Sequence, residues 1–99
     1  MRFRFGDKSL EMLFRAGAGR EKYPRGVVDM FLRRVRSIEA ATDERDLRAL
    51  KSLHFEKLQG QRDRYSIRLN EAWRLILTFE KDDQGKIVVI IEMNRHYGD

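Results

Sequence analysis

The chain opens with a period-two pattern and continues with a helical one. Phe3 and Phe5 alternate with arginines, which predicts a short edge strand. Asp7 is a residue type that caps helices, and we expect it to begin a helix over residues 8–16. One of the glycines at 17 and 19 should end this helix. Its inward stripe comprises Leu10, Leu13 and Phe14.

The longest helical pattern covers residues 25–41. Pro24 suits the first turn of this helix, because its missing amide hydrogen would be unpaired there in any case. Apolar side chains recur every three to four residues, and the arginines cluster outside their stripe. The stripe comprises Val27, Phe31, Val35 and Ile38, widened by Val28 and Leu32, and the arginines are Arg25, Arg33, Arg34 and Arg36. Thr42 or Asp43 then caps a short helical turn through Leu47 and Leu50 that leads to a sheet.

Period-two alternation returns in the second half of the chain. Apolar residues alternate with other residues over 65–69 and again over 73–79. The connection between them begins with Asn70, which tolerates positive φ, so an antiparallel hairpin follows. After a turn at residues 81–85, the apolar run 87–91 is typical of a strand covered on both faces.

These elements predict an α+β fold in a single domain of residues 1–99: two N-terminal helices packed on one face of a small twisted, mainly antiparallel sheet. Trp73 is in phase with the apolar residues of its strand, so we expect its ring in the core rather than stacked on a nucleic-acid base. Arg68 and Arg74 point to the opposite face, which Ile76 shares. That face is free for a ligand.

Charge adds a class of partner. The net charge is +5, with 15 arginines and 6 lysines, and planar guanidinium groups suit phosphate. Residues 1–36 carry ten basic and four acidic side chains, whereas residues 80–99 carry three and five. An acidic partner such as nucleic acid is therefore one interpretation, and a solvated basic surface is the other.

Several function classes lack support. The chain has no cysteine, no P-loop and no GxSxG motif, which removes thiolate, nucleotide-hydrolysis and serine chemistry. Its two histidines are 42 residues apart without a clustered carboxylate, so we expect no metal and no cofactor. No apolar stretch is long enough to span a bilayer and the N-terminus lacks a signal peptide, so we expect a cytoplasmic protein with no membrane partner.

Three segments carry a resemblance to a known family. They are Phe55-Glu-Lys-Leu-Gln-Gly60, the basic residues 61–68, and Trp73-Arg-Leu-Ile76. In this order they resemble the HigB branch of the RelE superfamily, whose members read Leu-x-Lys-Leu-x-Gly, a basic loop, Ser-Ile-Arg-x-Asn and Trp-Arg-Ile, and close with a histidine. Here the closing residues are Asn94-Arg-His-Tyr97. The resemblance also covers Leu10–Phe14 and Ile38–Thr42, and so spans nearly the whole chain.

The resemblance implies a RelE-like fold and the toxin of a type II toxin-antitoxin system. It implies a ribosome-dependent mRNA endoribonuclease that inhibits translation. The implied partners are mRNA, the ribosome and a helix-turn-helix, HigA-like antitoxin, with operator DNA contacted only through the antitoxin complex. Metal-free RNA cleavage uses the 2'-hydroxyl as an internal nucleophile. The protein then supplies a base, cations for the charged phosphorane and an acid for the leaving oxygen.

Residues for each role follow from their chemistry and the resemblance. Arg74 is the first candidate for the phosphate, because a strand can hold its guanidinium rigidly, and Lys57 is the second cation. The alternatives are an arginine paired with Glu71 or Glu80, and a lysine solvated at a strand edge. Proton transfer is assigned to His96, since imidazole titrates near neutrality. Tyr97 either stacks on an RNA base or shares the proton transfer. RNA contacts are assigned to Arg62, Arg64, Arg68 and His54. The alternative for these four residues is a role in solubility, packing or solvent exposure alone.

Two other functions stay open. A non-catalytic ParE-like toxin that acts on a topoisomerase needs no acid or base. An interaction module would use the basic second helix to bind an acidic antitoxin or operator complex.

Overall fold

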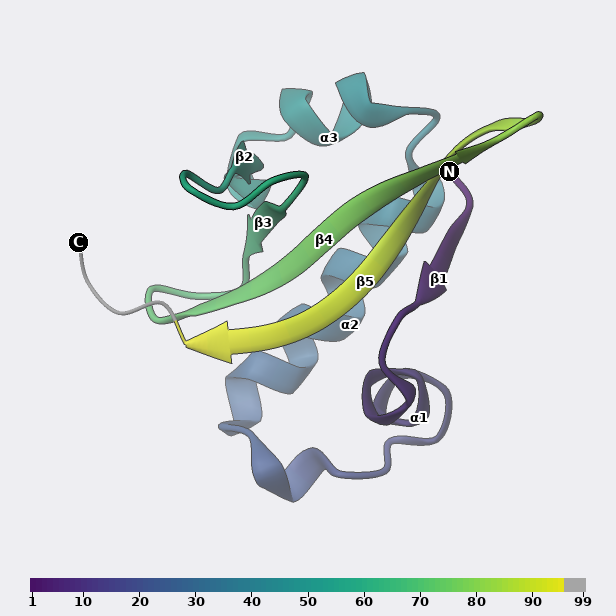
Figure 1. The fold of residues 1–99 in the computed structure, drawn as a ribbon. Helices are drawn as coiled ribbons and strands as arrows, with labels where there is room; N and C mark the ends of the chain where they lie inside the picture. Colours follow the sequence, from purple (N-terminus) through teal and green to yellow (C-terminus); the bar gives the residue numbers. More distant parts are fainter. Residues whose placement is uncertain (96–99) are drawn as a thin grey trace.

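A computed structural model describes residues 1–95 of the protein (Figure 1). Within these residues the chain forms three α-helices and five strands, with two short 3-10 turns. In chain order the elements are β1 (Phe3–Phe5), α1 (Lys8–Ala16), η1 (Arg20–Lys22), α2 (Arg25–Ala40), α3 (Glu44–Ala49), η2 (Lys51–Leu53), β2 (Glu56–Lys57), β3 (Tyr65–Arg68), β4 (Trp73–Asp82) and β5 (Gly85–Arg95). The α+β class is confirmed.

The five strands form one mixed sheet in the order β1-β5-β4-β3-β2. β1 runs parallel to β5, and the other neighbours are antiparallel. In Figure 1, α2 lies behind β4 and β5, with α3 at the top of the view and α1 at the lower right, below β1. One face of the sheet is therefore covered by helices, and we call the other the open face.

The core lies between α2 and the covered face of the sheet. The predicted stripe of α2 is buried, including Phe31 and Ile38, except for Leu32, which is partly buried. It belongs to one apolar cluster with Leu75, Leu77 and Ile90 from the two central strands. Since the cluster draws on helices and strands from both halves of the chain, neither half has a core of its own.

Local signals set the helix ends as predicted. The Asp7 carboxylate accepts a hydrogen bond from the Ser9 amide at 3.2 Å, and Gly17 ends α1 at φ 69°, where a side chain would be strained. Asp43 caps α3 by accepting from the Arg45 amide at 2.9 Å. α2 begins at Arg25, as expected, and Pro24 is the residue immediately before its first turn.

Three details differ from the sequence expectations. Asn70 is not at positive φ; its side-chain oxygen accepts from the amides of Ala72 and Trp73, both at 2.8 Å, and so closes the β3–β4 turn. Leu50 was expected within the helical turn but lies one residue beyond the end of α3, and it is 47% exposed. Arg34 was expected in the basic cluster outside the stripe, but its side chain donates hydrogen bonds to backbone carbonyls of β3 and η2.

No helix within residues 1–95 has both the length and the apolar character that a membrane crossing requires.

Candidate nucleic-acid interface

Strand register decides which side chains share the open face. Leu75 and Leu77 of β4 point into the core, so Arg74 and Ile76, which alternate with them, point the other way. Arg74 lies opposite Arg68 of β3 and opposite Asn94 of β5, and Ser66 lies opposite Ile76. The predicted placement of Arg68 and Arg74 on one face, together with Ile76, is confirmed.

One end of the open face is electrically neutralised. Arg2 binds the Asp82 carboxylate with both terminal nitrogens, at 2.9 and 2.7 Å. Arg4 binds Glu80 through Nε at 3.1 Å and Nη2 at 2.6 Å. These hydrogen bonds raise the pKa of both arginines, and Arg2 holds the pKa of Asp82 at about 2. Because each pair is bidentate, these guanidinium groups are occupied.

The other end holds two arginines without such forks. Arg74 is the better shielded, with 16% of its side chain exposed, and Nη1 lies 3.3 Å from one oxygen of Glu56 and 3.4 Å from Ser66 Oγ. Arg68 Nε donates to the Asn70 carbonyl at 3.3 Å, and no carboxylate within residues 1–95 forms an ion pair with it. Like charges directly opposite one another destabilise a sheet. The arrangement therefore favours an anion between or above the two guanidinium groups.

β2 does not bring Lys57 to this face. Its register places Lys57 opposite Tyr65, whose ring packs on the core side, and places Glu56 opposite Ser66 on the open face. The structure thus brings Glu56, rather than Lys57, next to Arg74. Lys57 is exposed and lines a separate hollow with residues 58–62, which include Arg62.

The basic loop between β2 and β3 is tied to the sheet. The Leu58 amide donates to the Arg64 carbonyl at 2.9 Å, which closes the loop. Thr78 Oγ1 of β4 donates to the Asp63 carbonyl at 2.6 Å, and Asp63 itself has a positive φ of 57°. Arg62 is exposed at the loop and Arg64 is half-buried at its end. Two of the predicted phosphate contacts are thereby held beside β3.

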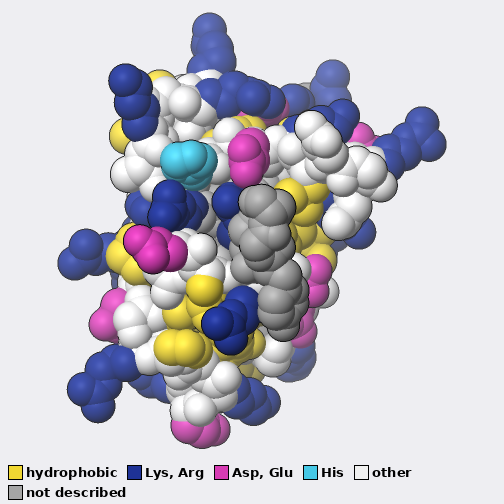
Figure 2. Space-filling model, turned by 90° about the vertical axis from the view of Figure 1, so that its left-hand side faces the viewer, with side chains coloured by type: hydrophobic (Ala, Val, Ile, Leu, Met, Phe, Trp, Pro, Cys, Tyr) yellow, Lys and Arg dark blue, Asp and Glu magenta, His cyan; other side chains and the backbone are white. Residues whose placement is uncertain are grey.

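Figure 2 views the molecule from the side of β2 and the β3–β4 turn, where lysine and arginine side chains project along the outline. His54 is exposed at the end of η2, with φ 50° in the left-handed region, a conformation that is uncommon outside glycine. Trp73 is half-buried and meets Tyr23 edge to face at 5.7 Å, so the structure places it at the rim of the core. His96 and Tyr97 lie outside the described residues.

Sequence reasoning missed the role of Arg34. Its Nε donates to the Arg68 carbonyl and its Nη2 to the Ser52 carbonyl, both at 3.0 Å. Burial, together with the charge of Arg33, lowers the pKa of Arg34. It ties α2 to the end of β3 and to η2. The available signal was its spacing, three residues after Phe31 and four before Ile38, which puts it on the edge of the buried stripe.

Sequence reasoning also missed Ser66, Glu56 and Asn94 as neighbours of Arg74. Ser66 was detectable, because it alternates in phase with Arg68. Within residues 1–95, no three histidine or carboxylate side chains gather closely enough to hold a metal ion. The described face offers guanidinium, hydroxyl and amide donors, which is chemistry suited to phosphate oxygens.

The chain is similar to known toxins in sequence and in fold. The family described as HigB-like toxin, RelE-like toxin of type II toxin-antitoxin system HigB, matches residues 3–93. Among solved structures, a YoeB/ParE toxin from Agrobacterium tumefaciens is similar with a TM-score of 0.57 and 12% identity, over 98% of this chain and 100% of that chain. No curated protein sequence matches the chain. At this identity the structural likeness shows a shared fold alone.

Proposed function

The chain belongs to the HigB-like family of RelE-like toxins from type II toxin-antitoxin systems, and we propose that it is an endoribonuclease that cleaves messenger RNA on the ribosome. The observation that carries this proposal is the pair of arginines, Arg68 and Arg74, held opposite one another on the open face without bidentate partners. A rigid pair of cations is what a phosphodiester in reaction requires, because negative charge grows on its oxygens as it becomes a phosphorane.

The proposed reaction needs no metal. The 2'-hydroxyl of the RNA attacks its own phosphate, the 5'-oxygen of the next nucleotide leaves, and a cyclic phosphate remains. Arg74 binds the non-bridging oxygens, and Ser66 beside it orients its guanidinium. Arg62, Arg64 and Arg68 bind flanking phosphates, with Lys57 and His54 at the margin.

Proton transfer is proposed for His96, with Tyr97 sharing it or stacking on a base. The last described residue of β5, Arg95, lies opposite Trp73, and the residue before it, Asn94, lies opposite Arg74. His96 is the next residue in the sequence. This connectivity supports the assignment of the histidine to the same site as Arg74.

The partner of the toxin is an antitoxin, as its family implies. We propose the helix-turn-helix, HigA-like type, with operator DNA contacted through the antitoxin complex, and the cytoplasm as the place of action. A second candidate function is binding to a topoisomerase without catalysis, because the similar solved structure carries the name YoeB/ParE.

Mapping RNA ends by sequencing after brief induction separates the two functions. Cleavage predicts new mRNA ends in wild-type cells, and their loss with R74A and with H96A. R4A is the matched control, since Arg4 lies on the same sheet face but is occupied by Glu80. If R74A and H96A arrest growth and cleave mRNA like wild type, the site assignment fails. Intact transcripts with DNA damage indicate the topoisomerase function instead.

A further inference from the structure

Three aromatic rings join β2 to the sheet. Phe55, the residue before β2, stacks on Tyr65 of β3 with centroids 5.5 Å apart and rings within 13° of parallel. Tyr65 meets Phe79 of β4 edge to face at 5.1 Å, and Phe55 lies 6.3 Å from Phe79. We call these three residues the aromatic trio.

A cation lies on each end of the trio. Arg48 Cζ from α3 is 5.0 Å from the centroid of the Phe55 ring, and Lys86 Nζ from β5 is 5.2 Å from that of Phe79. A cation at this distance from a ring face is attracted by its quadrupole. Both contacts stabilise the trio only while the two flexible side chains are held over the rings.

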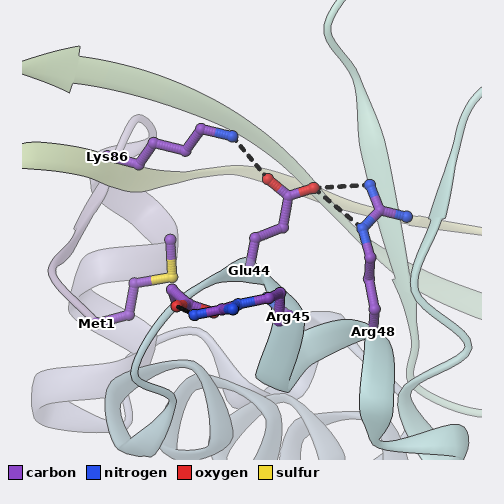
Figure 3. A pocket seen from close by; sticks show the side chains of 6 residues that line it. Met1, Glu44, Arg45, Arg48 and Lys86 are labelled. Carbon is purple, nitrogen blue, oxygen red and sulfur yellow. Dashed lines mark hydrogen bonds and ion pairs between the residues drawn. The ribbon is translucent and has the colours of Figure 1, made fainter.

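One carboxylate holds both cations (Figure 3). Glu44 Oε1 accepts from Lys86 Nζ at 2.8 Å, and Oε2 accepts from Arg48 Nη2 at 2.6 Å and Nε at 3.1 Å. Only 20% of the Glu44 side chain is exposed. The hydrogen bond from Lys86, with that from Arg48, lowers the pKa of Glu44, so the carboxylate is ionised at neutral pH. Two like charges are thus fixed in place by one shared counter-ion.

β2 depends on side-chain anchoring more than the other strands do. It has two residues, lies at the edge of the sheet and pairs only with β3. The residue anchored by the trio, Phe55, directly precedes Glu56, which contacts Arg74, and Lys57, which borders the basic loop. Because Glu56 and Lys57 are the next two residues in the chain, a shift of Phe55 moves both of them.

We propose that Glu44 is a positioning residue for β2: by holding Arg48 against Phe55, it fixes β2, and with it the start of the basic loop, beside the RNA-binding face. The position of β2 depends on the fold alone, whereas its consequence for RNA binding rests on the proposed function. No described atom of Glu44 contacts the open face, so its effect is indirect.

Glu44→Gln tests the proposal, because it removes the charge with little change in size. Amide hydrogen exchange at Leu58 and across the β2–β3 pairing should become about twofold to fivefold faster, the effect expected for losing an organised cation–π contact. Glu11→Gln is the matched control: Glu11 also pairs with an arginine four residues on, at 3.0 Å, but lies in α1. E11Q should leave β2 exchange at the wild-type rate.

Phe55→Leu shows whether Glu44 acts through the trio. If it does, the E44Q/F55L double variant exchanges at β2 about as fast as F55L alone, because the second change removes the same anchor. Effects that multiply would overturn the proposal, as would E44Q exchange that rises equally in α1 and β2 or does not change.

The consequence for RNA binding is measured separately. With an RNA substrate, E44Q should raise KM severalfold with a smaller effect on kcat, since β2 leads into the basic loop whose Arg62 and Arg64 are proposed to bind flanking phosphates, and carries no group proposed for proton transfer. A KM equal to that of wild type, with faster β2 exchange, would overturn the positioning role. If wild-type protein cleaves no RNA, the proposed function fails, and the exchange experiment still decides whether Glu44 fixes β2.

Discussion

Replacing Arg68 with glutamine should stabilise the folded protein and weaken its binding to RNA. Arg68 lies directly opposite Arg74, and cross-strand charge pairs contribute roughly 0.2–1 kcal/mol, with the sign unfavourable for like charges. The one hydrogen bond that its side chain forms within residues 1–95, to the Asn70 carbonyl, is long at 3.3 Å, and losing it offsets little of the gain. We therefore expect the free energy of unfolding to rise by about 0.5 kcal/mol. For a domain of this size, that raises Tm by roughly 2–4 °C.

The effect on RNA has the opposite sign. Hydrogen bonds to charged groups contribute about 1.5–3 kcal/mol, and each 1.4 kcal/mol is a factor of about ten in Kd. R68Q should therefore bind a single-stranded RNA at least about tenfold more weakly. The slope of log K against log salt should fall by about 0.7, the value for one phosphate contact on a single strand. Thermal unfolding by circular dichroism and fluorescence anisotropy with a 2'-deoxy-blocked oligonucleotide measure the two effects.

Arg4→Gln is the matched control for R68Q. Arg4 lies on the same face but forms a fork with Glu80 at 3.1 and 2.6 Å, so its loss should lower Tm and leave RNA affinity unchanged. If R68Q lowers Tm as R4Q does, and binds RNA with wild-type affinity and salt slope, then the two arginines are equivalent surface residues. The distinction between occupied and available guanidinium groups would then be refuted.

Three further changes test separate contacts. Glu56→Gln removes the carboxylate 3.3 Å from Arg74 and should raise RNA affinity about twofold to fivefold in the same anisotropy assay; an unchanged Kd would show that Glu56 does not compete with phosphate. The Arg2 hydrogen bonds depress the pKa of Asp82 from 3.8 to about 2, so the stability it contributes is complete above about pH 4 and is lost as the pH falls toward 2. Urea unfolding of D82N should depend less on pH over that range, and parallel curves for the two proteins would contradict the assignment. Arg34→Met leaves two backbone carbonyls without their donor and should lower the free energy of unfolding by about 1–3 kcal/mol in urea, whereas wild-type stability would show that water replaces the guanidinium at no cost.

The helices were predictable because their signals are local. Asp7 and Gly17 bound α1 through contacts within two to four residues, and the apolar period of α2 maps directly onto its buried face. The face of β4 was also predictable, since Trp73, Leu75, Leu77 and Phe79 occupy every second position and only Ile76 is apolar among the residues between them. Wherever a pattern repeats several times within one element, register and burial follow from it.

β2 and β5 lacked that kind of signal. A two-residue strand has no period, so the sequence could not tell that Glu56 rather than Lys57 faces Arg74. The apolar run of β5 hides its register because every position is hydrophobic, and a β-bulge shifts the pairing so that Ile76 faces Glu92 and Leu77 faces Ile90. Glu44 and Lys86, which are joined by a hydrogen bond, are 42 residues apart in the chain, and no local pattern encodes such a contact.

Charge on the open face is distributed by pairing rather than by composition. Arg2 and Arg4 have carboxylates from β4 at the end where that strand meets β5, so the field of these arginines is cancelled within a few ångströms. Arg68 and Arg74 have only partial partners, so their field extends into solvent over roughly a Debye length of about 8 Å. An approaching polyanion is therefore drawn to the end of the face where β3 stops and β4 starts. The direction of attraction is set by which arginines are already bound, although all four contribute equally to the net charge of +5.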